Sequence, residues 1–83
     1  MTLLYFAWVR QKIGKSEENV TLPQNIGDVR GLAAHLARLG AGYAEALGEE
    51  SRLRVAVNQR HVAFDAAIGD GDEVAFFPPV TGG

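Results

Sequence analysis

LLYFAWV at positions 3–9 and EVAFF at positions 73–77 are the two stretches that decide the fold of this chain. In the first stretch apolar side chains occupy both even and odd positions, a pattern typical of a strand that is covered on both faces. The second reads as the last strand, and Pro78 and Pro79 end its pairing because proline has no backbone N–H. We therefore expect the two strands to lie side by side, in parallel, in the middle of one sheet.

A helix is predicted to begin after Asp28, whose side chain can cap the first turn. Apolar residues then recur at helical spacing and form one stripe, and Arg38 and Gly40 mark the end of the helix. The stripe consists of Val29, Leu32, Ala33, Leu36 and Leu39. Because only one side of this helix is apolar, we expect it to cover one face of the sheet.

Shorter elements complete the pattern, and each is bounded by turn-forming residues. The first is an edge strand at 20–22, which forms a hairpin with the first strand and is closed by Pro23. The others are a helical turn at 43–47, a strand at 53–57, a tight turn at Asn58 and Gln59, a short strand through Val62 and Phe64, and a turn at 70–72. This order predicts an α+β fold with a mixed sheet of four to five strands and one main helix on one face. It is the β-grasp arrangement of ubiquitin, formed by residues 1–83 as a single domain from which residues 78–83 protrude as a tail.

Composition excludes several classes of function. The chain has 83 residues, 47% of them apolar, a formal charge of −2 and no cysteine, which rules out thiolate chemistry and cysteine-ligated metals. No basic stripe is present to neutralise phosphates, and the start of the chain has neither a basic leader nor a membrane-length apolar run, so we expect no nucleic acid, no membrane and a cytoplasmic location. The acidic residues at 70–73 fit turn chemistry better than a cation site, so no metal is expected.

The last six residues, PPVTGG, carry the most informative chemistry. Pro78 and Pro79 predict a stiff stem, and the four residues from Val80 to Gly83 could extend roughly 13 Å, far enough to enter another protein's pocket. Gly82 and Gly83 lack Cβ atoms and could pass a narrow channel. A terminal carboxylate needs activation by ATP to become an acyl donor, and this sequence has no phosphate-cradling loop. An activating enzyme is therefore expected to supply that chemistry.

The sequence resembles the molybdopterin synthase small subunits, a family of ubiquitin-like sulfur carriers. The resemblance lies in residues 71–83, GDEVAFFPPVTGG, together with Leu4–Ala7 and Val55–Gln59. It implies that a ubiquitin-activating-type adenylyltransferase consumes ATP to adenylate Gly83, and that a sulfur donor then converts it to a thiocarboxylate. It further implies that the large synthase subunit receives the tail in a heterotetramer and that the sulfur reaches a pterin precursor, while this chain binds no cofactor and is no enzyme on its own.

A docking face is expected on the side of the sheet that the helix leaves bare. Strand alternation points Ala56, His61, Ala75 and Phe77 outward, and the resemblance favours Phe6 outward with Leu4 and Trp8. The expected partner-binding residues are Phe6, His61, Phe77, Pro78, Pro79, Val80 and Thr81, beside the catalytic terminus at Gly82 and Gly83.

Two other functions remain open from the residues alone. One is a β-grasp sulfur carrier for another pathway, such as thiamin synthesis, tRNA thiolation or protein tagging, because such carriers also end in Gly-Gly. The other is a β-grasp binding module whose tail is inert, since many terminal Gly-Gly pairs have no role.

Overall fold

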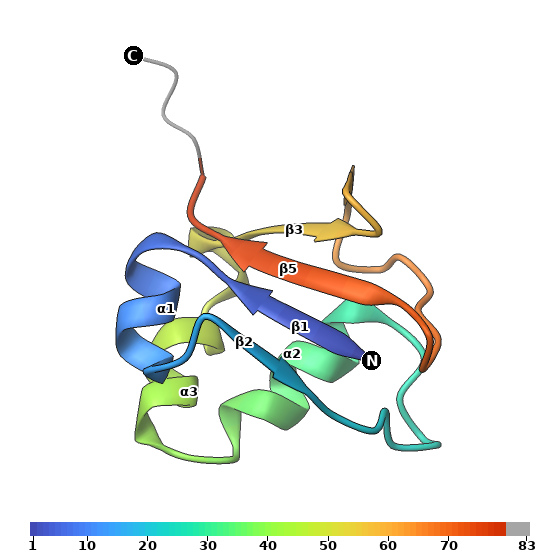
Figure 1. The fold of residues 1–83 in the computed structure, drawn as a ribbon, viewed down its shortest axis with the longest axis horizontal. Helices are drawn as coiled ribbons and strands as arrows, with labels where there is room; N and C mark the ends of the chain where they lie inside the picture. The colour runs from blue at the N-terminus through green and yellow to red at the C-terminus, as the bar shows by residue number, and fades with distance from the viewer. Residues whose placement is uncertain (80–83) are drawn as a thin grey trace.

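The computed structural model describes residues 1–79 as one mixed five-stranded sheet with helices packed against it (Figure 1). The fold therefore agrees with the predicted α+β class and with the β-grasp arrangement. In chain order the elements are β1 (Thr2–Tyr5), α1 (Ala7–Ile13), β2 (Glu17–Asn19), α2 (Val29–Ala37), α3 (Ala41–Leu47), the 3-10 turn η1 (Glu50–Arg52), β3 (Arg54–Val57), β4 (Arg60–Val62) and β5 (Glu73–Phe77).

The strands lie in the order β2-β1-β5-β3-β4, which puts the first and last strands of the chain in the middle. β1 and β5 are parallel, with Leu3 opposite Val74 and Tyr5 opposite Phe76. The other neighbours are antiparallel. The predicted central pairing of the two chain ends is thus confirmed, and the carboxyl ends of β1 and β5 point to the same edge of the sheet.

The hydrophobic core lies between the sheet and the helices, which occupy one side of it (Figure 1). Leu3, Tyr5 and Phe76 point into this core and are at most 1% exposed. Asp28 caps α2 as predicted, since its side chain accepts a hydrogen bond of 2.8 Å from the Gly31 N–H. The helices contribute Val9, Val29, Leu32, Ala33, Leu36, Ala46 and Leu47 to the same core.

The first apolar stretch is not one strand, which corrects the expectation for residues 3–9. β1 ends at Tyr5, and α1 begins at Ala7, whose φ of 53° turns the chain out of the sheet. Val9 is buried beneath this helix, and Gly14 ends it in a left-handed conformation with φ 87°. The stretch is apolar at both parities because it supplies a strand and then the buried side of a helix.

Two further boundaries differ from the prediction. The edge strand is β2 at Glu17–Asn19, three residues earlier than 20–22, and it pairs with β1 across α1 instead of through a hairpin turn. Leu39 lies beyond the end of α2 and is 55% exposed, so the apolar stripe ends at Leu36. The predicted turn at Asn58 and Gln59 is confirmed, because both residues adopt the positive φ angles of a tight hairpin.

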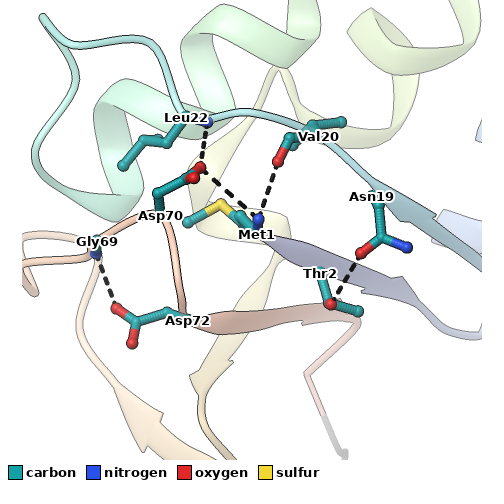
Figure 2. A network of polar contacts seen from close by, with 8 residues as sticks. All are labelled: Met1, Thr2, Asn19, Val20, Leu22, Gly69, Asp70 and Asp72. Carbon is teal, nitrogen blue, oxygen red and sulfur yellow. Dashed lines mark hydrogen bonds and ion pairs between the residues drawn. The ribbon is translucent and has the colours of Figure 1, made fainter.

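Polar contacts link the chain segments at the end of the sheet where β1 and β5 begin. The amino group of Met1 lies 2.9 Å from the Val20 carbonyl oxygen and 3.7 Å from Asp70 Oδ1 (Figure 2). The same Asp70 oxygen accepts a 2.7 Å hydrogen bond from the Leu22 N–H. These contacts tie the start of β1 to the loops before α2 and before β5.

A second polar group, which we call the Glu18 cluster, links the edge strand β2 to α3. Glu18 accepts hydrogen bonds from the hydroxyls of Tyr5 and Tyr43, at 2.8 and 2.7 Å, and from Lys15 Nζ at 3.2 Å. Burial alone would raise the pKa of Glu18, but these three hydrogen bonds together lower it below the ordinary carboxyl value. The short β2 strand is therefore held by side chains as well as by its ladder.

Candidate functional site

The stem of the tail continues directly from the central strand β5. Phe77 is the last residue of β5, and Pro78 and Pro79 follow it, half-buried, as the chain leaves the body of the protein (Figure 1). The expected catalytic residues Gly82 and Gly83, and the expected partner contacts Val80 and Thr81, lie outside the described residues. The fold thus brings the chain to the edge of the sheet at Pro79.

One face of the sheet is left without helices and carries the residues that alternation predicted to point outward. Ala56 lies opposite both Ala75 and His61, and Ala75 also lies opposite Leu4 in the neighbouring strand. None of these four side chains belongs to the hydrophobic core cluster. They form a row across four strands, on the face that the helices do not cover.

Aromatic side chains extend this row toward the stem. The His61 and Phe77 rings lie 5.2 Å apart between centroids, at an interplanar angle of 56°. Phe6 follows the end of β1 and is 48% exposed, which among the large apolar side chains of residues 1–79 is exceeded by Leu39. We refer to Leu4, Phe6, Ala56, His61, Ala75 and Phe77 together as the outer patch.

Trp8 does not belong to the outer patch, which corrects the expectation that it points outward with Leu4 and Phe6. It lies in α1 and packs partly buried against the core. The guanidinium carbon of Arg52 lies 5.0 Å from the centroid of its ring. Trp8 changes sides because the chain leaves the sheet after Tyr5, and strand alternation no longer applies to it.

Sequence reasoning did not single out Arg54 as a site residue. In the structure Arg54 lies directly opposite Phe77 in the β3–β5 ladder, at the base of the stem. Its side chain is exposed and donates one hydrogen bond, from Nη1 to the Leu53 carbonyl oxygen at 2.9 Å. The available signal was its alternation with Val55, which places Arg54 on the outer face once β3 is paired with β5.

Other kinds of site find little support in the part of the chain that the structure describes. Within residues 1–79 no three His, Asp or Glu side chains gather closely enough to hold a metal ion. Over the same range, no helix combines the length and the apolar character needed to cross a bilayer. A hollow of about 380 Å³ lies between α2 and the end of α3, and the ion pair of Arg30 and Glu50 forms part of its lining.

Comparison with known proteins matches this chain over nearly its whole length. The model of the ThiS family matches residues 3–83. The molybdopterin synthase sulfur carrier subunit of Escherichia coli (strain K12) is 46% identical over 81 residues, which cover 98% of this chain and 96% of that protein. The protein of the same name from Haemophilus influenzae is 40% identical, covering 100% and 99%. The resemblance to molybdopterin synthase small subunits is therefore confirmed.

Solved structures share the fold. SAMP1 from Haloferax volcanii superposes with a TM-score of 0.78 at 26% identity, covering 100% of this chain and 98% of that one. A putative molybdopterin converting factor subunit 1 from Pyrococcus furiosus gives 0.69 at 31% identity, covering 95% of each chain. The family match, the relatives that align end to end and the shared β-grasp fold together show that this chain belongs to the ThiS family.

Proposed function

We infer that this protein is the sulfur-carrying subunit of a molybdopterin synthase and is not catalytic on its own. The observation that carries the inference is the end-to-end similarity to proteins named molybdopterin synthase sulfur carrier subunit, at 46% and 40% identity. The described structure is compatible with such a role, because its central strand leads straight into the stem formed by Pro78 and Pro79.

The proposed reactive group is the main-chain carboxylate of Gly83. A carboxylate oxygen would attack the α-phosphorus of ATP and release pyrophosphate, which gives an acyl adenylate with AMP as a good leaving group. A sulfur nucleophile at the level of sulfide would then attack the acyl carbon, displace AMP and leave a thiocarboxylate. Its sulfur remains anionic at neutral pH and is a better nucleophile than a carboxylate oxygen, which suits transfer to a pterin precursor.

Two partners follow from this chemistry. A ubiquitin-activating-type adenylyltransferase would bind ATP, so the chain itself needs no cofactor, and the large synthase subunit would receive the charged tail. We propose a heterotetramer of two carriers and two large subunits. Because activation consumes ATP, we also propose that the protein works in the cytoplasm.

The outer patch is the proposed docking surface for both partners. It joins Phe6 and Phe77 through small alanines, so a partner could approach the sheet closely on either side of the stem. Phe6 is exposed and Phe77 is half-buried, whereas Ala56 and Ala75 are covered by their neighbours, so the aromatic rings offer most of the apolar surface that a partner could cover. Such apolar surface beside polar groups is typical of protein interfaces. His61 stands at the border of this patch, packed on Phe77, and is proposed to contact the partner with it.

A second function is kept because of the structural neighbours. SAMP1, whose fold matches this chain well, takes its name from the small archaeal modifier proteins. A β-grasp carrier that tags proteins, or one that serves thiamin synthesis or tRNA thiolation, would use the same terminus with another acceptor. The acceptor would distinguish these pathways, because only a molybdopterin synthase carrier delivers sulfur to a pterin.

The test is a reconstituted synthase made from this protein, its large subunit, its activating enzyme, ATP and a sulfur source. The full chain is expected to support sulfur transfer to the pterin precursor, and a variant that lacks Gly82 and Gly83 is expected to support none. A binding module with an inert tail would retain the partners' activity after this deletion. Sulfur transfer to a tRNA or a protein, with none to the pterin, would favour the second function.

A further inference from the structure

We propose that Arg52 and Arg54 form a basic clamp at the base of the tail that docks on carboxylates at the rim of the partner's tail-binding channel. The proposal rests on the proposed function, since it assumes that a partner receives the tail. It concerns how that partner is oriented and selected, which the outer patch and the tail do not specify by themselves.

Topology brings both arginines to the stem. β3 runs antiparallel to β5, so the first residue of β3 lies beside the last residue of β5, and Arg54 is opposite Phe77 in the ladder. Arg52 ends η1, two residues earlier, and its guanidinium lies over Trp8 of α1. Figure 1 shows the start of β3, the end of β5 and α1 at the same end of the sheet.

Both guanidinium groups keep unused hydrogen-bonding capacity. An arginine side chain has five N–H donors, and for Arg54 one hydrogen bond is formed within residues 1–79. No ion pair joins Arg52 or Arg54 to a carboxylate in that range. The carboxylate of Glu50, next to Arg52 in η1, is held by two hydrogen bonds from Arg30 at 2.8 and 2.9 Å.

The densest acidic group of the described residues lies at the other end of the sheet from Arg52 and Arg54. The chain carries a formal charge of −2, and the acidic residues Asp70, Asp72 and Glu73 lie around the start of β5, at the opposite edge of the sheet. Near the stem the charges are mixed, because exposed Glu17 lies opposite Leu4 at the end of β1 and exposed Glu49 precedes η1. A partner whose carboxylates lie close to Arg52 and Arg54 would be attracted by these two arginines and repelled by the acidic end, which favours an approach of the partner to the end of the sheet that carries Phe77.

The neighbouring outer patch favours a protein partner over a polyanion such as nucleic acid. Arg54 shares its face of the sheet with Phe77, whose ring packs on His61. An apolar centre with an arginine at its border is typical of protein–protein interfaces, where arginine is enriched. Arginine also binds carboxylates through its planar fork, with two parallel hydrogen bonds.

The experiment measures association of the full-length carrier with its purified large subunit, and separately with its activating enzyme, by stopped-flow at low and at physiological ionic strength. R54Q and R52Q are each expected to slow association about fivefold at low salt and to reduce its salt dependence. R60Q is the matched control, because Arg60 is also exposed but lies in β4 opposite Val57, at the end of the sheet away from the stem. It should leave the association rate and its salt dependence unchanged.

Two controls separate this inference from the proposed function. If F77A weakens binding at both salt concentrations and the wild-type tail is converted to a thiocarboxylate, while R54Q and R52Q associate like wild type, the basic clamp is refuted and the carrier function stands. If wild type binds neither partner, the proposed function fails first.

R54K retains the positive charge but not the planar guanidinium, so slower dissociation of wild type than of R54K would support paired hydrogen bonds to a carboxylate. An equal loss in R60Q would instead reveal a non-specific charge effect and overturn the proposal.

Discussion

Replacing Phe6 by alanine should weaken docking strongly while leaving the fold nearly intact. Phe6 is 48% exposed, and since an aromatic side chain offers roughly 200 Å² of surface, about 100 Å² remains for a partner to cover. At about 25 cal/mol per Å² that area corresponds to about 2.5 kcal/mol. Alanine keeps a methyl group, so we expect a loss of about 2 kcal/mol of binding free energy, or roughly thirtyfold in Kd.

The assay is isothermal titration of the large subunit with wild type and F6A, beside thermal unfolding of each carrier alone. Leu39→Ala is the matched control, because Leu39 is also apolar and 55% exposed but follows α2 on the helical side. F6A should lower the free energy of unfolding by no more than about 1 kcal/mol. The reasoning is refuted if L39A weakens binding as much as F6A does, or if F6A unfolds the protein and thereby places Phe6 in the core.

Three further predictions concern the scaffold. Gly42→Ala should destabilise the protein by about 2 kcal/mol in urea unfolding, because the new Cβ would overlap the Lys12 carbonyl oxygen where α1 crosses α3; an unobstructed helix would instead gain stability from alanine. Asp28→Ala should cost about 1 kcal/mol through loss of the α2 cap, with D28N as the variant that keeps it. The pKa of Glu18 is lowered below 4.5 in the folded protein, so the stability that the Glu18 cluster contributes is present above pH 4.5 and is lost as the pH falls through the folded pKa. E18Q should remove this loss of stability from an acid-unfolding curve, and a curve identical to that of wild type would contradict the prediction.

The central pairing of the sheet could be predicted because its signals are local and strong. EVAFF is bounded by the turn at 70–72 on one side and by two prolines on the other, and its observed limits, Glu73–Phe77, are the predicted ones. The cap at Asp28 and the hairpin turn at Asn58 and Gln59 were equally well defined, because each needs a particular residue type at one position.

The first stretch misled because an apolar run at both parities does not distinguish a strand from a buried helix. The change from β1 to α1 depends on a positive φ at Ala7. The sequence has no glycine or asparagine at this position, the residue types that would have indicated such a φ angle. β2 was misplaced for the opposite reason, since Glu17–Asn19 has little strand propensity and is held by β1 and by the Glu18 cluster. Tertiary contacts decided both elements.

The side chains on the helix-free face of the sheet could be predicted from alternation wherever the strands were correctly placed. Ala56, Ala75 and Phe77 lie on the outer face as expected. The prediction for Trp8 was wrong because Trp8 lies in α1, where strand alternation does not apply. The position of Arg54 beside Phe77 became visible only after β3 was seen to pair with β5. Which residues share a face can be derived from period-two spacing, but which strands are neighbours depends on the whole topology.

The proposed function depends on chemistry at the terminal carboxylate, and intact-mass analysis tests that chemistry most directly. The protein is incubated with ATP, its activating enzyme and a sulfur source, then weighed whole and fragmented from its C-terminus. We predict a mass increase equal to the replacement of one oxygen by sulfur, located on Gly83 and absent when ATP is omitted. An unchanged mass, under conditions that charge a known carrier with its own activating enzyme, or sulfur located on any other residue, would contradict the account.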